Sequence, residues 1–212
     1  MPGSLRIREL DEYRKNPQIR PGENFRFKCV RCDVCCGTGP NVHLSVFDVV
    51  RMARYLDVDV VTFLHLYTNL IVAAHIPHIS LAGDVNGRCV FLGFDEEGRT
   101  YCKIYPARPM KCRLYPGLPI APGAERLELD TKCPGLEEAG EGDYSSIPSG
   151  LYRAYSEEMR KHYKIVFQKV VEQGMDPVDA IYGILRDLAR QLKEGKTPEW
   201  ADLEWLEKMG YT

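Results

Sequence analysis

The sequence lacks several features that would place the protein in a familiar class. The formal net charge of its 212 residues is only −2, so no global field would recruit nucleic acid. The longest apolar run, around Leu70–His75, is far shorter than a transmembrane helix. The charged first ten residues contain no apolar core segment, so no signal peptide is expected. We therefore expect a cytoplasmic protein that uses neither nucleic acid nor a membrane as a partner.

Common catalytic patterns are also missing. The short Gly37-Thr-Gly39 segment follows no expected strand, so it does not form a dinucleotide or methyl-donor loop. No Ser-His-Asp or Cys-His set stands at a convincing location for hydrolysis, and the chain has no internal repeat. Composition and common motifs therefore leave the catalytic residues, if there are any, unassigned.

Cysteine is the residue that stands out. Eight cysteines lie between residues 29 and 133, and thiolates at two-residue gaps can converge on a soft metal ion or an iron–sulfur cluster. In a reducing cytosol, clustered cysteines hold metal more often than they form disulfides, although disulfides remain the alternative in hyperthermophiles. The candidate metal ligands are Cys29, Cys32, Cys35, Cys36, Cys89, Cys102, Cys112 and Cys133.

The spacing of these cysteines favours iron–sulfur over zinc. Cys29, Cys32 and Cys35 have the spacing of the bacterial ferredoxin run, in which a remote Cys-Pro supplies the fourth ligand, and Cys133-Pro134 is a candidate for that position. Structural zinc sites more often show separate pairs. The favoured cofactor is a 4Fe-4S cluster, with zinc or iron ions as the alternative.

The adjacent Cys35 and Cys36 indicate more than one centre. Neighbouring side chains in extended backbone point to opposite sides, so the two thiols would face different centres or one would bridge. Eight ligands at four per centre give about two centres. We therefore hypothesise a dinuclear or two-cluster arrangement with Cys29, Cys32 and Cys35 on one side.

Basic residues flank the cysteines, and two interpretations of them stay open. In one, they offset thiolate charge and bond to sulfur or carbonyl groups. In the other, Arg108 and Arg113 bind the carboxylate or phosphate of a substrate. His43 is a candidate neighbour of the metal or a substitute ligand, whereas His65 and His162 lie on apolar helical stripes and are expected in the core. The flanking cations are Lys28, Arg31, Arg88, Lys103, Lys111, Arg113 and Lys132.

The pattern along the chain predicts one compact α+β domain, with an irregular Cys-rich metal core and a small antiparallel hairpin surrounded by about five helices. An N-terminal arm (1–24), a cysteine-cluster region (25–136) and a helical region packed on it (148–212) are expected. The expected helices cover 45–56, 59–71, 151–170, 176–192 and 197–206, and the expected hairpin pairs 89–94 with 99–105. Residues 107–115 are expected as a turn or short helix, 126–130 as an edge strand and 135–149 as a linker.

The combined cysteine pattern resembles a known family, the CxxCxxCC cysteine-cluster proteins described as zinc- or iron-chelating domains. The resemblance covers roughly residues 25 to 136 and includes all eight cysteines. It is carried by Cys29-Val-Arg-Cys32-Asp-Val-Cys35-Cys36-Gly, Leu44–Arg51, Cys89-Val-Phe-Leu, Gly98–Pro116 and Cys133-Pro134.

The resemblance implies metal binding through these cysteines. It also suggests an enzymatic function as an alternative. Flagellin lysine-N-methylases, which use S-adenosylmethionine, are similar to members of this family. The C-x-x-x-C-x-x-C spacing typical of radical chemistry on that donor is absent here. We expect a metal-binding protein in a redox or accessory role, with a protein partner or protein substrate. The alternatives are a zinc-stabilised interaction module and an S-adenosylmethionine-dependent protein lysine methyltransferase.

Overall fold

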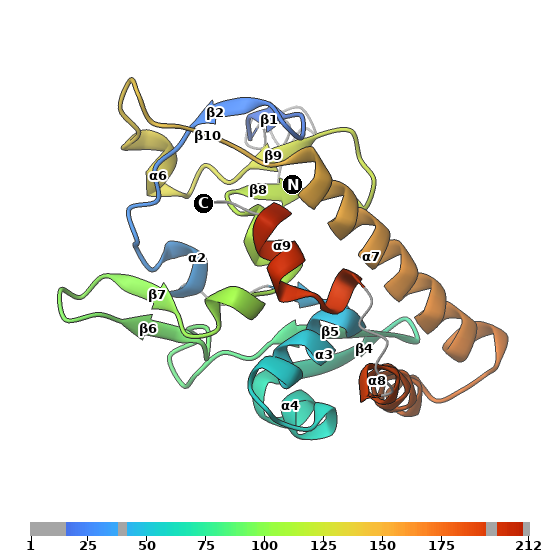
Figure 1. Ribbon diagram of the computed structural model, residues 1–212. Coiled ribbons are helices and arrows are strands. Elements are labelled where there is room, and N and C mark those ends of the chain that lie inside the picture. Colours follow the sequence, from blue (N-terminus) through green and yellow to red (C-terminus); the bar gives the residue numbers. More distant parts are fainter. Residues whose placement is uncertain (1–15, 38–41, 194–198, 210–212) are drawn as a thin grey trace, which may run out of the picture.

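The computed structural model describes residues 16–37, 42–193 and 199–209 (Figure 1). The first half of the chain contains β1 (Gln18–Ile19), β2 (Asn24–Arg26), α2 (Val34–Gly37), β3 (His43–Leu44), α3 (Val46–Tyr55), α4 (Val60–Tyr67), β4 (Thr68–Ala73), β5 (Ile76–Leu81), β6 (Leu92–Phe94) and β7 (Thr100–Cys102). The second half contains η1 (Tyr105–Ala107), α5 (Met110–Leu114), β8 (Gly117–Pro119), β9 (Leu127–Leu129), α6 (Pro134–Glu137), β10 (Tyr144–Ser146), α7 (Ser149–Phe167), η2 (Gln168–Glu172), α8 (Pro177–Lys193), η3 (Glu199–Ala201) and α9 (Leu203–Met209).

Side-chain caps set the starts of the two central helices, as predicted. Ser45 and Asp48 form a reciprocal capping box at the N-terminus of α3. The carboxylate of Asp59 accepts hydrogen bonds from the backbone N–H groups of Val61 and Thr62 at the start of α4. Each cap satisfies backbone donors that have no partner within the helix. These local signals were sufficient to place the start of each helix.

The segment after α4 differs from the prediction. The expected helix over 59–71 ends at Tyr67, and residues 68–81 form a β-hairpin in which β4 pairs with β5 from Thr68↔Leu81 to Ala73↔Ile76. Ala74 and His75 make the turn with positive φ angles of 49° and 66°. The run is rich in Ile, Val and Thr, which favour pleated structure once a neighbouring strand is available. Strand β3 provides that neighbour through His43↔Ser80.

Two further expectations need correction. Strand β9 is the central strand of the sheet β1-β9-β8, not an edge strand. The expected linker over 135–149 contains part of α6 and the whole of β10, which pairs with β2. Both corrections have one cause. Residues from the first 26 positions pair with segments more than a hundred residues later, and no local pattern encodes such pairing.

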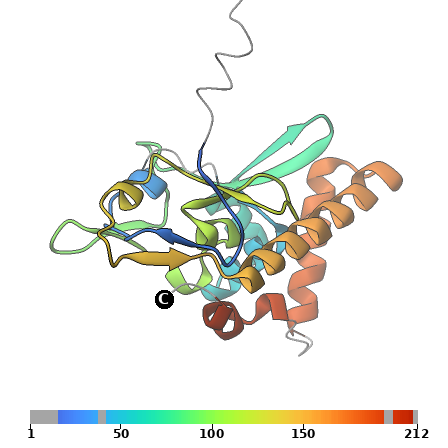
Figure 2. The same cartoon turned by 90° about the horizontal axis from the view of Figure 1, so that it is seen from above.

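The hydrophobic core consists of two clusters. One joins α3, α4 and β5 to α8, with Phe63, Ile79 and Ile181 fully enclosed. The other joins α5 and β9 to α7, with Met110 and Leu127 at its centre. Figure 2 shows α7 running along one side of the molecule, away from hairpin β6–β7. The cysteine segments lie where the two clusters meet, because Cys36, Cys89 and Cys102 belong to the first cluster and α5 belongs to the second.

The architecture is a mixture of helices with small antiparallel sheets, as the α+β prediction stated. The five expected helices correspond to α3, α4, α7, α8 and α9, and the expected hairpin is β6–β7. The start of the last helix was expected at residue 197, which lies outside the described residues. None of the helices in the described part of the chain has the length and hydrophobicity needed to cross a bilayer. The division of the chain at residues 24, 136 and 148 stays a prediction.

Candidate metal centre

The eight cysteines come from five separate segments, and all eight are free thiols. Cys29 and Cys32 precede α2, Cys35 and Cys36 lie in α2, Cys89 precedes β6, Cys102 ends β7, Cys112 lies in α5 and Cys133 is the N-cap of α6. Figure 1 shows α2 between hairpin β6–β7 and α6. The fold thus brings together segments that are up to about a hundred residues apart in sequence.

Backbone hydrogen bonds fix the first cysteine loop to two of the other segments. The N–H of Lys28 donates to the carbonyl of Gly135 (3.0 Å), which joins this loop to α6. The N–H of Thr100 donates to the carbonyl of Arg31 (3.0 Å), and its hydroxyl donates to the carbonyl of Cys32 (2.6 Å), which joins the loop to β7. These bonds hold Cys29 and Cys32 near Cys133 and Cys102.

A further backbone bond ties α2 to the segment that carries Cys89. The N–H of Cys89 donates to the carbonyl of Cys36 (2.7 Å). Cys89 also forms an isolated bridge with Gly83. Register in the hairpin pairs Cys102 with Leu92, three residues after Cys89, so Cys89 and Cys102 lie at the same end, as predicted.

Cys35 and Cys36 form a close pair of thiols. Their sulfur atoms are 3.7 Å apart. The expectation that they point to opposite sides assumed extended backbone, whereas residues 34–37 form a helical turn, where neighbouring side chains diverge by about 100°. The hydrogen bond between the two thiols lowers the pKa of Cys35 to about 7 and raises the pKa of Cys36.

The thiols form two groups according to which of them affect one another's pKa values. Cys35 belongs to both groups. Burial raises the pKa of Cys112, and the charges of Cys102 and Cys89 raise it further. The charges of Cys89 and Cys112 also act on Cys36. The charges of Cys32 and Cys35 act on Cys133 instead. Cys35 acts on members of both groups, and Cys29 is exposed at the edge of the first loop.

A tyrosine hydroxyl lies beside the sulfur of Cys133. The N–H of Asp130 donates to the carbonyl of Pro116 (2.9 Å), which continues the β8–β9 ladder and brings Tyr115 next to the segment that ends in Cys133. The Tyr115 hydroxyl is buried and has no hydrogen-bond partner among the described residues. Burial raises the pKa of Cys133, and the backbone N–H of Gly135 and the nearby Tyr115 hydroxyl oppose that rise.

Three arginines near the cysteines make structural contacts. Arg113 is fully enclosed and donates to the carbonyl oxygens of Arg108 (3.2 Å) and Pro106, which agrees with the structural interpretation of this residue. The guanidinium of Arg108 stacks on the ring of Tyr105 at 3.7 Å and lowers the pKa of Cys102, which burial raises. Arg31 pairs with Asp95 at 3.1 Å.

The cysteine segments lie near one another, but their thiols do not surround a common metal position. Within residues 16–37, 42–193 and 199–209, no three His, Cys, Asp or Glu side chains are placed to hold one metal ion together. The donor set nevertheless fits a soft cation, because each buried thiol is surrounded by other thiols whose charges raise its pKa. A metal would remove that mutual repulsion.

Sequence reasoning missed two groups beside the cysteines. The first is the buried set Ser45, Asp48, Arg51 and Glu158. The second is a contact of His43 with His78 and His162, at ring separations of 5.6 and 5.7 Å. His162 is fully buried as expected, but His65 is exposed and contacts Tyr182. For the buried set around Arg51, the only sequence signal was that charged residues occur on the helices α3 and α7 close to their apolar positions.

Comparison with known proteins identifies the family of this chain. Residues 28–137 match the family model described as "CxxCxxCC: Putative zinc- or iron-chelating domain". The match covers just over half of the chain, and the chain therefore belongs to this family. An uncharacterized protein of Methanocaldococcus jannaschii is 31% identical over 90 residues, which cover 42% of this chain and 44% of that protein. The chain thus matches less than half of that relative's length, and no solved structure matches the chain.

Proposed function

We propose that the eight cysteines bind metal as two neighbouring four-thiolate centres, and that the native occupant is iron in iron–sulfur clusters with a redox or accessory role. One centre would use the first loop and the remote Cys-Pro, and the other would use the hairpin and α5. Cys29, Cys32, Cys35 and Cys133 form the first group, and Cys36, Cys89, Cys102 and Cys112 form the second.

The observation that carries this proposal is the position of Cys133. It lies about a hundred residues after the first loop, yet its thiol interacts with Cys32 and Cys35, and the Lys28–Gly135 hydrogen bond holds its segment against that loop. A close-spaced triple completed by a remote Cys-Pro is the ligand pattern of the bacterial ferredoxin run. The arrangement therefore supports iron–sulfur at this end of the site.

The second group is more enclosed. Cys89 is buried, Cys36, Cys102 and Cys112 are partly buried, and their charges act on one another. Uncompensated thiolates in such a place are costly, so the proposal requires cationic metal to neutralise them. A metal bound by these thiols would link the first loop to the hairpin. Part of the metal-binding free energy would then appear as folding stability.

Zinc is the second candidate, and one distance favours it. The 3.7 Å separation of the Cys35 and Cys36 sulfurs is close to the edge of a tetrahedron of thiolates at about 2.3 Å from a central ion, about 3.8 Å. Two thiolates on one zinc ion would keep this separation. In that case the protein would be a zinc-stabilised interaction module. Nothing in the described residues adds support for S-adenosylmethionine-dependent methyl transfer.

The proposal is tested by metal analysis of the full chain purified without oxygen. Iron with acid-labile sulfide and broad visible absorption would support iron–sulfur, whereas tightly held zinc in a colourless protein would support the module. Because the two groups use different ligands, Cys133→Ser and Cys112→Ser should each lower the metal content by about half. If both variants keep the full metal content, the proposed ligand sets are wrong.

A further inference from the structure

The stretch that contains hairpin β4–β5 has an unusual charge pattern. No Lys, Arg, Asp or Glu occurs between Asp59 and Asp84, although such residues make up 27% of the chain. The stretch includes all of α4, β4 and β5. Buried strands are often uncharged, but the outer half of this hairpin is not buried. The absence of charge there calls for a physical explanation.

Strand β4 is an edge strand with apolar side chains in solvent. The sheet order is β3-β5-β4, so only one side of β4 is paired within the described residues. Ile71 and Val72 are 56% and 46% exposed. Figure 2 shows the hairpin extending from the body beside the C-terminal part of α7. The exposed edge is therefore also the most projecting part of this sheet.

Strand β4 lacks the features that normally keep sheet edges apart. Proteins protect exposed edges with charged residues, proline, bulges or a covering segment. β4 reads Thr-Asn-Leu-Ile-Val-Ala and contains neither charge nor proline, and its pairing with β5 is continuous over all six residues. A regular, neutral and apolar edge of this kind favours addition of another strand.

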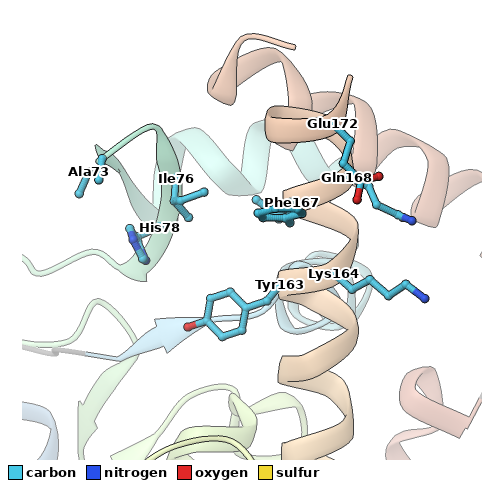
Figure 3. A pocket seen from close by; sticks show the side chains of 10 residues that line it. Ala73, Ile76, His78, Tyr163, Lys164, Phe167, Gln168 and Glu172 are labelled. Carbon is cyan, nitrogen blue, oxygen red and sulfur yellow. The ribbon is translucent and has the colours of Figure 1, made fainter. Parts of the chain in front are cut away.

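A shallow apolar groove widens the exposed surface next to this edge. A cavity of about 720 Å³ lies between the hairpin and α7, lined by Ala73, Ala74 and Ile76 on one side and by Val166 and Phe167 on the other. Figure 3 shows the Phe167 ring directed across the cavity toward Ile76. Phe167 is 49% exposed. The exposed strand edge and the groove are thus adjacent, and the groove is mainly apolar, with Lys164, Gln168 and Glu172 on its helical side.

We propose that β4 pairs in antiparallel orientation with β4 of a second copy of this chain, so that the two three-stranded sheets join across a two-fold axis. The absence of charge argues for this occupant. The edge offers no complement to an acidic or basic partner, whereas two identical neutral edges meet without repulsion. A two-fold contact also pairs a strand with its own reversed copy, which is the pairing that an antiparallel ladder requires.

The first test compares two valine variants by light scattering and sedimentation, in the presence of reductant, from about 5 µM to about 500 µM, the range expected of a modest interface. The wild type should approach twice its 24.2 kDa as concentration rises. Val72→Lys places like charges on both edges and should weaken dimerisation by about tenfold or more. Val85→Lys is the matched control, because Val85 is fully exposed in a loop away from the hairpin.

A second measurement does not depend on how a variant folds. Hydrogen exchange of the wild type at low and high concentration should show added protection of amides in residues 68–73 at high concentration only. A wild type that stays monomeric throughout the range would overturn the proposal. So would a dimer that Val72→Lys leaves unchanged, because the contact would then lie elsewhere. None of these outcomes depends on metal content, so the proposed function is tested separately.

Discussion

The carboxylate of Asp48 accepts a hydrogen bond from the backbone N–H of Met110 (3.0 Å), two residues before Cys112. The same carboxylate pairs with Arg51, whose guanidinium also binds Glu158 of α7 through two bonds of 2.6 and 2.9 Å. All three ionic side chains are buried. Helix α7 lies outside the residues that match the family model, yet through this network it supports the helix that presents Cys112.

Replacing Glu158 should therefore destabilise the protein and disturb metal binding. Glu158→Gln keeps the shape of the side chain but leaves the Arg51 charge without its second carboxylate. Removing one partner of a buried ion pair typically costs about 3 kcal/mol or more. Urea unfolding of the metal-free protein should show this loss. The control is Glu157→Gln, because Glu157 is exposed on the same helix. Equal stabilities for the two variants would contradict this account of the network.

The contact between the first cysteine loop and α6 has no room for a side chain at Gly135. A Cβ atom there would collide with the carbonyl oxygen of Lys28. Gly135→Ala should push the loop away from Cys133, and metal should be lost more readily to a chelator. Gly142→Ala is the matched control, since a Cβ there meets no atom within 4 Å. Chelator competition that fails to separate the two variants would count against the proposed first group.

The Tyr115 hydroxyl should strengthen metal binding through Cys133. Hydrogen bonds to charged groups contribute about 1.5–3 kcal/mol, so Tyr115→Phe should weaken metal binding by about tenfold or more. The unfolding free energy of the metal-free protein should change less, because the uncharged thiol is a weak acceptor. Tyr105→Phe serves as control, because Tyr105 is 53% exposed. If the hydroxyl has only a packing role, both variants will bind metal equally.

The buried His162 should make stability depend on pH. Burial lowers its pKa from 6.5 to about 3, so the unfolded chain binds a proton between these values while the folded protein does not. The contribution of neutral His162 to the free energy of unfolding is therefore fully present above pH 6.5. It is lost as pH falls toward 3, at up to about 1.4 kcal/mol per pH unit.

His162→Asn isolates this effect. The Asn oxygen can replace Nδ1 as acceptor for the Val46 N–H, a bond of 3.2 Å in the wild type, but the side chain does not titrate. Urea unfolding at pH 7 and pH 5 should show a smaller loss of stability for the variant than for the wild type. An identical pH dependence in both proteins would mean that the pKa of His162 is the same in the folded and unfolded states, which would contradict the effect of burial.

Local signals explain which parts of the fold were predictable. The caps Ser45 and Asp59 act on donors within three residues, so sequence alone located the starts of α3 and α4. The apolar residues after Tyr67 fit either a helix or a strand, and the choice depends on pairing with β3 and β5. Such pairing depends on distant residues, so the hairpin was missed.

The candidate site was likewise predictable only where local sequence determines the structure. The cysteine spacing predicted a candidate ligand set, which stays a prediction, and the turn at Asp95–Gly98 predicted that Cys89 and Cys102 lie at the same end of the hairpin, which is confirmed. The backbone of α2 was not predictable, and it changes the direction of the Cys35 and Cys36 side chains. The Arg51–Glu158 pair spans 107 residues. Charges on helices usually face solvent, so no pattern in either helix marked these two as partners.

The central claim is that the gathered thiols bind metal, and element analysis of the full chain purified without oxygen tests it most directly. We predict more than one iron or zinc ion per chain, held by protein that loses both metal and melting temperature when Cys35 or Cys36 is replaced by serine. Less than one metal ion per chain, or a Cys36→Ser protein with unchanged metal content and melting temperature, would contradict the account.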